Sequence, residues 1–295
     1  MIRAAGHPPV VLSIAGSDPS GGAGVQADLK TFSALGGYGC AVLTALTAQN
    51  TRGVTGVFPI PASFVGEQLD TLFADIAVDA VKIGMIANAE IAGTVARALR
   101  TYRPRFVVLD PVMVATSGDR LLEPAAEQIL RAELLPLADL ITPNLAEAAV
   151  LLDTPLAANL SDARNQAVAL RELGAVRVLM KGGHLDTGSS ATDLLVDEHG
   201  GILRLDAPRI DTANTHGTGC TLSSAIAVLR VGSPDWPSAV RLAKDYLSSA
   251  LAGADELSIG GTGVDRTEYH GHGPVHHFVG RWTRDAAQRE GQRPT

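Results

Sequence analysis

Residues 215–220 read Thr-His-Gly-Thr-Gly-Cys, and a stretch without glycine or proline follows over residues 221–231. This pattern predicts a glycine-rich turn that leads into the first turn of a helix over residues 221–231. The first amides of a helix have no partner within it and lie at the positive end of its dipole, so the turn should bind an anion. The alternative is an ordinary glycine-rich helix start with a buried cysteine.

The composition of this turn suits the transfer of a phosphoryl group. Gly217 and Gly219 lack the Cβ atoms that would hold a phosphate away from the amides of Thr218 and its neighbours. Cys220 closes the turn with a titratable thiol, where a base or charge partner would be needed. The helix dipole should lower the pKa of this thiol and apolar burial should raise it, and we expect Cys220 to be at least partly thiolate when substrate is bound.

Outward from this turn, the chain alternates between apolar strand patterns and helical patterns. A strand is expected at 10–15, and a polar turn after it leads into a helical pattern through Leu29, Phe32 and Leu35. Further strands are expected at 40–47, 80–83, 106–109, 140–141 and 177–180, a hairpin at 191–196 and 202–205, and helices at 62–73, 89–99, 124–135, 144–152, 162–173 and 236–252. Such alternation predicts an α/β fold with a mostly parallel central sheet and helices on both faces.

Composition and charge set limits on the class of protein. The 295 residues are 46% hydrophobic, without a Ser/Pro-rich linker or an internal repeat, so we expect one domain over 1–282 and a polar C-terminal tail over 283–295. The formal charge of −7 and the lack of a Lys/Arg run argue against a nucleic-acid partner. Cys40 and Cys220 have no metal-type spacing and are expected to be free thiols in a reducing compartment. The first nine residues suit neither a signal peptide nor a membrane anchor, so a cytoplasmic protein without membrane contact is expected.

The loops that follow the expected strands should meet at one rim of the sheet, where ligands bind in open parallel sheets. Lys181 lies in a Lys-Gly-Gly turn there, and Asp110 and Glu147 are two carboxylates that could hold Mg²⁺ through water. We assign Asn144, Lys181, Thr215 and His216 to ATP and its phosphates. The ordinary alternatives are a solvated lysine, a turn aspartate before Pro111, and a capping glutamate that pairs with Asn144.

A flat substrate would need apolar walls and a few oriented polar groups. The amide of Gln49 can donate and accept together, which suits a heteroaromatic ring. Met85 and Val112 are candidate walls. Asp28 is a candidate substrate contact, but a carboxylate early in a helix also has a purely structural explanation.

Three other classes of protein fit the sequence less well. Residues 22–27 match the loose Gly-x-Gly dinucleotide pattern, but 38–50 lacks the acidic residue which that pattern expects at the second strand. No Gly-x-x-x-x-Gly-Lys-Ser/Thr motif is present, which argues against a P-loop enzyme. A non-catalytic sensor of a small molecule would need neither the lysine and carboxylates nor Cys220.

An ordered series of motifs from about residue 10 to residue 278 resembles the hydroxymethylpyrimidine/phosphomethylpyrimidine kinases of thiamine biosynthesis, in the ribokinase-like superfamily. The motifs are Ala-Gly-Ser-Asp-Pro-Ser-Gly-Gly-Ala-Gly at 15–24, Gln-Ala-Asp at 26–28, Thr-Ala-Leu-Thr-Ala-Gln-Asn-Thr at 44–51, Lys-Ile-Gly-Met at 82–85, Asp-Pro-Val-Met at 110–113, Thr-Pro-Asn-Leu-Ala-Glu-Ala at 142–148, Lys-Gly-Gly-His at 181–184, the turn at 215–220, and Gly-Pro-Val-His-His-Phe at 273–278.

The resemblance implies phosphorylation of 4-amino-5-hydroxymethyl-2-methylpyrimidine, and then of its monophosphate, with ATP and Mg²⁺. It implies that Gln49 binds the aminopyrimidine edge, that Ala23, Met85 and Val112 line the pocket and that Gly16 gives a backbone contact. Cys220 would take the position of the catalytic base, and the protein would be a homodimer. Pyridoxal kinases share the cysteine turn, so phosphorylation of vitamin B6 is the nearest alternative. From loop composition, residues 114–120 are expected to act as a lid over the phosphates.

Overall fold

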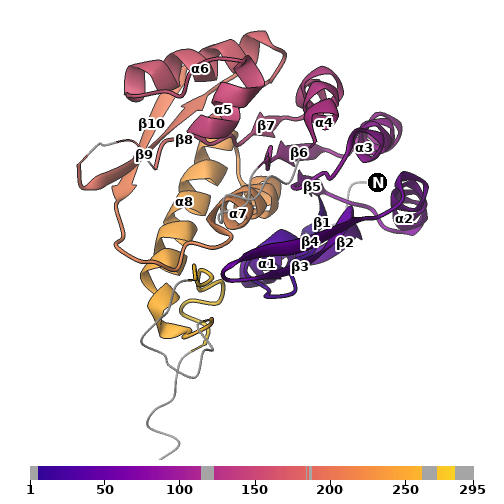
Figure 1. Ribbon diagram of the computed structural model, residues 1–295, viewed down its shortest axis with the longest axis horizontal. Coiled ribbons are helices and arrows are strands. Elements are labelled where there is room, and N and C mark those ends of the chain that lie inside the picture. The colour runs from indigo at the N-terminus through magenta and orange to yellow at the C-terminus, as the bar shows by residue number, and fades with distance from the viewer. Residues whose placement is uncertain (1–5, 114–122, 184, 186–187, 261–270, 283–295) are drawn as a thin grey trace, which may run out of the picture.

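The computed structural model describes residues 6–113, 123–183, 185, 188–260 and 271–282. The expected tail at 283–295 and the expected lid at 114–120 lie outside these residues. The molecule is built around an eight-stranded sheet in the order β10-β9-β8-β7-β6-β5-β1-β2 (Figure 1). Strands β1, β2 and β5 to β8 are parallel, and β9 runs antiparallel to both of its neighbours, so the expectation of a mostly parallel sheet is confirmed.

The strands of this sheet are β1 (Val10–Ala15), β2 (Tyr38–Leu43), β5 (Ala80–Ile83), β6 (Phe106–Leu109), β7 (Leu140–Ile141), β8 (Val178–Lys181), β9 (Ser190–Val196) and β10 (Ile202–Pro208). The helices are α1 (Gly24–Ala34), α2 (Ala62–Asp75), α3 (Ala89–Tyr102), α4 (Pro124–Ile129), which continues in a π-helical turn (Leu130–Leu134), α5 (Leu145–Leu152), α6 (Leu160–Glu172), α7 (Thr218–Gly232) and α8 (Trp236–Ala252). Within the described part of the chain, no helix is both long and apolar enough to cross a membrane.

Helices cover both faces of the sheet, and each face has its own apolar core (Figure 1). Side chains from α2 to α6 pack on one face, and side chains from α1, α7 and α8 pack on the other. Because both faces are buried, β1 is buried along its whole length and reads as an unbroken apolar run apart from Ser13. Val11 and Ala80 point to the α1–α7 side, which is also where the polar side chains of Ser13 and Lys82 lie.

The expected strand at 40–47 is wrong, because the chain leaves the sheet at Thr44. Residues before Thr44 form β2, and residues after it form β3 (Ala45–Asn50), which pairs with β4 (Gly53–Pro59) in a separate antiparallel sheet. Thr44 is fully buried, and its hydroxyl donates to the Met85 carbonyl at 2.7 Å. These contacts turn the chain outward and place Gln49, next to a bulge in the β3–β4 pairing, on the small sheet.

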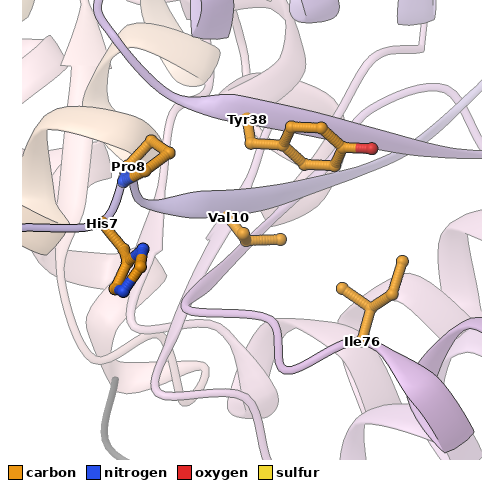
Figure 2. Close-up of a pocket in the computed structure, with 5 residues that line it drawn as sticks. All are labelled: His7, Pro8, Val10, Tyr38 and Ile76. Carbon is orange, nitrogen blue, oxygen red and sulfur yellow. The ribbon is translucent and has the colours of Figure 1, made fainter. Parts of the chain in front are cut away.

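Helix α7 begins three residues earlier than expected. Gly217 is its N-cap residue with φ of 79°, so Thr218, Gly219 and Cys220 form the first helical turn rather than the loop before it. At the opposite end of the sheet, a shallow apolar hollow is lined by His7, Pro8, Val10, Tyr38 and Ile76 (Figure 2). That hollow lies at the amino ends of β1 and β2, whereas ligands of open parallel sheets bind beyond the carboxyl ends.

Candidate active site

The start of α7 is packed against the glycine-rich loop that follows β1. A Cβ atom on Gly217 would lie 1.8 Å from the Gly22 carbonyl oxygen, so only glycine fits this approach. The positive φ of Gly217 also favours glycine. The Thr215 carbonyl accepts a hydrogen bond from the Thr218 hydroxyl at 2.6 Å, which closes the turn before the helix. The amides of Gly219 and Cys220 lie in the first turn, where a helix offers them no internal partner.

Lys181 brings a positive charge to this helix start. A Cβ atom on Gly219 would stand 3.2 Å from Lys181 Nζ and 3.4 Å from Asp110 Oδ2, so the glycine leaves the helix start open toward both groups. Lys181 Nζ donates to Asp110 Oδ1 at 2.9 Å and lies 3.8 Å from Glu147 Oε2. The structure therefore brings the amides of α7, the lysine and both carboxylates to one place.

The charges in this cluster shift one another's pKa values. Burial alone would raise the pKa of Asp110, but Lys181 and Lys82 hold it below its ordinary value. Burial raises the pKa of Glu147 to about 7, an effect that Lys181 opposes and Asp110 reinforces. Burial would lower the pKa of Lys181, but Asp110 and Glu147 raise it above its usual range. Lys181 is therefore a permanent cation, while Glu147 can gain a proton near neutral pH.

Asn144 and Glu147 form the capping pair that was the ordinary alternative for them. The Asn144 side chain accepts from the Glu147 amide at 2.8 Å, and Glu147 Oε2 accepts from the Asn144 amide at 2.7 Å. Asn144 also forms an isolated bridge with Lys181, which places it beside the cluster. The capping role does not remove Glu147 from the site, because the same side chain lies near Lys181.

The thiol of Cys220 is protonated at neutral pH. Burial raises its pKa to about 11, although Lys82 opposes that shift and the Gly24 amide donates to the sulfur. The expected lowering of the thiol pKa by the helix start is therefore outweighed by desolvation.

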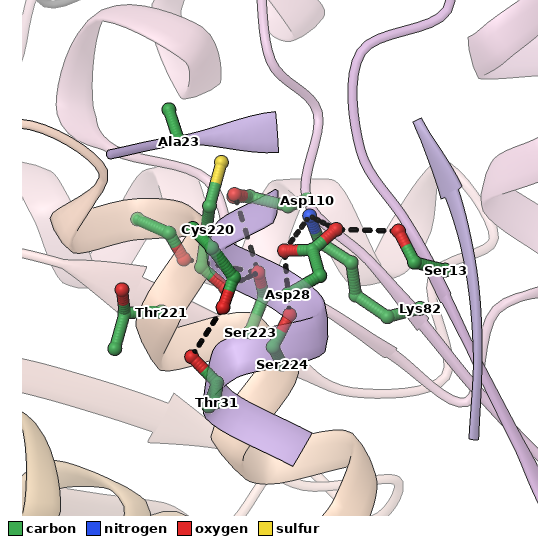
Figure 3. A network of polar contacts seen from close by, with 12 residues as sticks. Ser13, Ala23, Asp28, Thr31, Lys82, Asp110, Cys220, Thr221, Ser223 and Ser224 are labelled. Carbon is green, nitrogen blue, oxygen red and sulfur yellow. Dashed lines mark hydrogen bonds and ion pairs between the residues drawn. The ribbon is translucent and has the colours of Figure 1, made fainter. Parts of the chain in front are cut away.

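A second buried cluster lies beneath the start of α7 (Figure 3). Lys82 Nζ donates to both oxygens of Asp28 at 2.8 Å, and both side chains are fully buried. Ser13 donates to Asp28 at 2.5 Å, and Ser224 of α7 donates to it at 2.7 Å. These contacts support the structural explanation for Asp28, and its role as a substrate contact stays a prediction.

The residues expected around the pyrimidine are linked through the loop after β1. A Cβ atom on Gly16 would lie 2.9 Å from Met85 Sδ, so Gly16 and Met85 are in close contact. The Ser17 carbonyl accepts from the Thr47 hydroxyl at 2.9 Å, and that hydroxyl lies 3.2 Å from Gln49 Oε1. Gln49 is thereby tied to the same loop that carries Gly16.

Ala23 and Val112, the other two residues expected to line the pyrimidine pocket, lie on different loops. Ala23 directly precedes α1, and its amide donates to Asp18 Oδ2 at 2.8 Å. Val112 lies two residues beyond Asp110 and packs against the core on the α2–α6 side.

The ring of His216 contacts the loop after β1, and the assignment of this residue to ATP stays a prediction. Its ring is buried, and Nε2 lies 2.7 Å from Asp18 Oδ2. The imidazole is thus directed at this loop.

Several residues of the site were missed from the sequence. Asp18, Lys82, Thr142 and Ser223 all bond to groups of the site, the last two by donating to Asp110 at 2.9 and 3.3 Å. Lys82 carried a usable signal, because a lysine within a buried apolar strand requires a buried partner. The other three carried none that a single sequence reveals.

Solved structures of known proteins share this fold. The fold and site define a ribokinase-like small-molecule kinase: the crystal structure of phosphomethylpyrimidine kinase from Clostridium difficile 630 is 42% identical, with a TM-score of 0.72 over 82% of this chain and 99% of that one. The pyridoxal kinase of Staphylococcus aureus in complex with AMP-PCP and pyridoxal is 31% identical, with a TM-score of 0.81 over 93% of this chain and 95% of that one.

The family itself follows from the sequence match. The model of the phosphomethylpyrimidine kinase family matches residues 18–276, and the chain belongs to this family. The hydroxymethylpyrimidine/phosphomethylpyrimidine kinase of Escherichia coli is 55% identical over 271 residues, which cover 92% of this chain and 98% of that protein.

Proposed function

We propose that this protein transfers the γ-phosphoryl group of ATP to the hydroxymethyl oxygen of 4-amino-5-hydroxymethyl-2-methylpyrimidine, and then a second phosphoryl group to the resulting monophosphate. The observation that carries the proposal is the 55% identity to the E. coli kinase over nearly its whole length. In each step the substrate oxygen bonds to phosphorus, the bond from phosphorus to the ADP oxygen breaks, and the substrate oxygen loses its proton.

The start of α7 and Lys181 are the proposed phosphoryl site. Phosphoryl transfer depends on positioning and on charge stabilisation, since the transition state spreads negative charge over the transferred group. The amides of Gly219 and Cys220 can donate to that group, whereas the Thr218 amide already donates to the Thr215 carbonyl at 3.2 Å and helps to shape the turn. Lys181 Nζ, close to Gly219, adds a fixed positive charge. Asn144 and Thr215 flank this site and are proposed to contact ATP.

Asp110 and Glu147 are the proposed Mg²⁺ carboxylates. The described residues include no group of three or more metal-ligating side chains placed around one point. Two carboxylates fit a Mg²⁺ ion that keeps several waters and binds substrate phosphates as well. Both lie within 4 Å of Lys181 Nζ, at 2.9 and 3.8 Å, so the three groups face the same space. When bound, the ion would neutralise charge on the phosphates.

Cys220 is proposed to stand at the position of the catalytic base. Because burial raises the pKa of its thiol to about 11, the role requires that Cys220 lose this proton in the reaction. Cys220→Ala should lower kcat, and Cys220→Asp, which supplies a carboxylate at the same place, should retain part of it. Undiminished turnover by Cys220→Ala would remove the residue from the mechanism.

Gln49, Gly16, Ala23, Met85 and Val112 are the proposed pyrimidine site. Gln49→Ala should raise KM for the pyrimidine alcohol ~10-fold or more, because a substrate amino group would lose its partner, and should leave KM for ATP unchanged. Equal changes in the two KM values would argue that Gln49 does not face the pyrimidine.

A parallel assay of ADP formation tests the activity itself. The purified protein, ATP and Mg²⁺ are mixed with the pyrimidine alcohol, its monophosphate, or pyridoxal, with and without EDTA. We expect turnover of both pyrimidines and loss of turnover with EDTA. Turnover of pyridoxal alone would favour the vitamin B6 alternative, and tight pyrimidine binding without ADP would favour a sensor.

We further propose that the protein is a homodimer located in the cytoplasm. Exposed apolar side chains on β3, β4 and α2 support a contact with a second copy, and they are Leu46, its cross-strand partner Phe58, and Phe64. Phe58→Lys should convert the dimer to a monomer, which light scattering would detect as a halved mass. An unchanged mass would rule out this face as the dimer interface. Cys40 and Cys220 are not joined in a disulfide, which suits a reducing compartment.

A further inference from the structure

A buried aspartate–histidine pair joins the two glycine-rich segments of the site. Asp18 and His216 are 1% and 6% exposed, and they meet at 2.7 Å across 198 positions of sequence. Asp18 belongs to the loop between β1 and α1, and His216 lies two residues before α7. Neither side chain belongs to the phosphoryl or pyrimidine groups described above.

Asp18 organises its own loop with the rest of its carboxylate. Oδ2 accepts from the Ala23 amide at 2.8 Å, and Oδ1 accepts from the amide and the hydroxyl of Ser20 at 2.9 and 2.7 Å. The backbone amide of Asp18 donates to Gln26 Oε1 at 2.8 Å. Burial would raise the pKa of Asp18, but the contacts with His216, Ser20 and Ala23 lower it to about 2. The Asp18 carboxylate is therefore ionised, and both of its oxygens take part in hydrogen bonds.

His216 is held from the other side by the C-terminal segment and by close packing. Its backbone amide donates to the Gly273 carbonyl at 3.0 Å, and His216 forms an isolated bridge with Pro274. A Cβ atom on Gly22 would lie 2.3 Å from His216 Cδ2, so the ring packs directly against the loop backbone. The next residue, Gly217, approaches the Gly22 carbonyl, and the two segments are thus in contact at two successive positions.

We propose that Asp18 and His216 are a positioning pair that fixes the loop carrying Ala23 against the start of α7. This inference rests on the proposed function, in which that loop lines the pyrimidine pocket and α7 holds the transferred phosphoryl group. Because the Asp18 carboxylate binds the Ala23 amide and the His216 ring together, it sets the distance between the pocket wall and the phosphoryl site. An error of ~1 Å in such a distance can cost ~100-fold in rate.

Hydrogen exchange tests the pair without reference to activity. In His216→Gln the side-chain nitrogen takes the place of Nε2 and can still donate to Asp18, whereas the shorter His216→Asn cannot reach it. We expect amide exchange in residues 17–24 to rise ~10-fold or more in His216→Asn and to stay near wild type in His216→Gln. His199→Asn, on the exposed β9–β10 turn, is the matched control and should leave this segment unchanged. Equal protection in both His216 variants would overturn the proposal.

Steady-state kinetics tests the consequence for the reaction. His216→Asn should lower kcat ~10-fold or more and leave KM for ATP within about twofold, and His216→Gln should recover most of the loss. Asp18→Ala combined with His216→Asn should be no slower than the slower single variant, because the contact between the two side chains is lost in all three. Independent losses that multiply would contradict a shared contact.

The outcomes separate this inference from the proposed function. If the wild-type protein fails to phosphorylate the pyrimidines, the proposed function falls, while the exchange experiment still decides whether the pair holds the loop. If His216→Asn does not fold, His216→Leu takes its place in the exchange experiment, because it fills much of the space of the ring and cannot donate to Asp18. Wild-type protection of residues 17–24 in a folded His216→Leu protein would then overturn the proposal.

Discussion

Burial raises the pKa of the Cys220 thiol, whereas Lys82 and the Gly24 amide lower it, and burial has the larger effect. With a pKa raised to about 11, Cys220 should be alkylated by iodoacetamide at pH 8 ~100-fold more slowly than a thiol with the ordinary value. The rate should then rise about tenfold for each pH unit up to pH 10, as the thiolate fraction grows. The measurement is the difference in alkylation rate between wild type and Cys220→Ser, which retains only Cys40. A rate that levels off below pH 8 would show a low thiol pKa and contradict this balance.

Single residues were predictable where the chemistry of one side chain suffices. The proximity of Lys181 to Asp110 and Glu147 was predictable, because a cation and two carboxylates follow expected strands and the sheet brings such positions together. His216 and Asp28 were assigned from their neighbours in sequence, but their partners lie 198 and 54 positions away. Those pairings depend on how α1 and α7 pack on the sheet, which residue type alone does not specify.

Two glycines lie at the start of α7, and glycine is needed at each of them for a different physical reason. Gly217→Ala places a Cβ atom 1.8 Å from the Gly22 backbone at φ of 79°, so we expect a loss of more than ~3 kcal/mol in unfolding free energy. Gly219→Ala meets only the ends of Lys181 and Asp110 and lies inside the helix, where alanine is favoured by ~1 kcal/mol. It should fold as well as wild type or better but lower kcat ~10-fold or more, because the methyl group fills the proposed phosphoryl site.

Urea unfolding and the ADP assay on both variants check this contrast. The expected pattern is a low unfolding midpoint for Gly217→Ala and a normal midpoint with low turnover for Gly219→Ala. Full activity in Gly219→Ala would place the transferred group elsewhere.

The elements were predictable where the local pattern agrees with the final packing. The strands at 10–15, 80–83 and 106–109 have the expected bounds, because short apolar runs of this kind are typical of parallel strands that are buried on both faces. Strand β4 was missed, because five of its seven residues are exposed and it has no alternating pattern. The break at Thr44 depends on hydrogen bonds to Ala15 and Met85, which are distant in sequence.

At the scale of the whole molecule, the buried pair of Lys82 and Asp28 ties the site to the sheet. Lys82 comes from β5 and Asp28 from α1, while the serines that complete the cluster come from β1 and α7 (Figure 3). Two strands and two helices from distant parts of the chain therefore meet at the Asp28 carboxylate. The order of elements was predictable from the sequence, but this polar joint within an apolar core was not, because it breaks the rule that places apolar residues there.

The joint predicts an unusual pattern of stability in variants. Lys82→Met leaves the carboxylate of Asp28 buried without its cation, which should cost ~3–5 kcal/mol of unfolding free energy. Adding Asp28→Asn removes the buried charge and still offers hydrogen bonds to Ser13 and Ser224, so the double variant should be more stable than Lys82→Met alone. Urea unfolding at pH 7 measures both differences. A double variant that loses the sum of the two single losses would show that the lysine and the aspartate stabilise the fold independently, and the start of α7 would then not be held through their pairing.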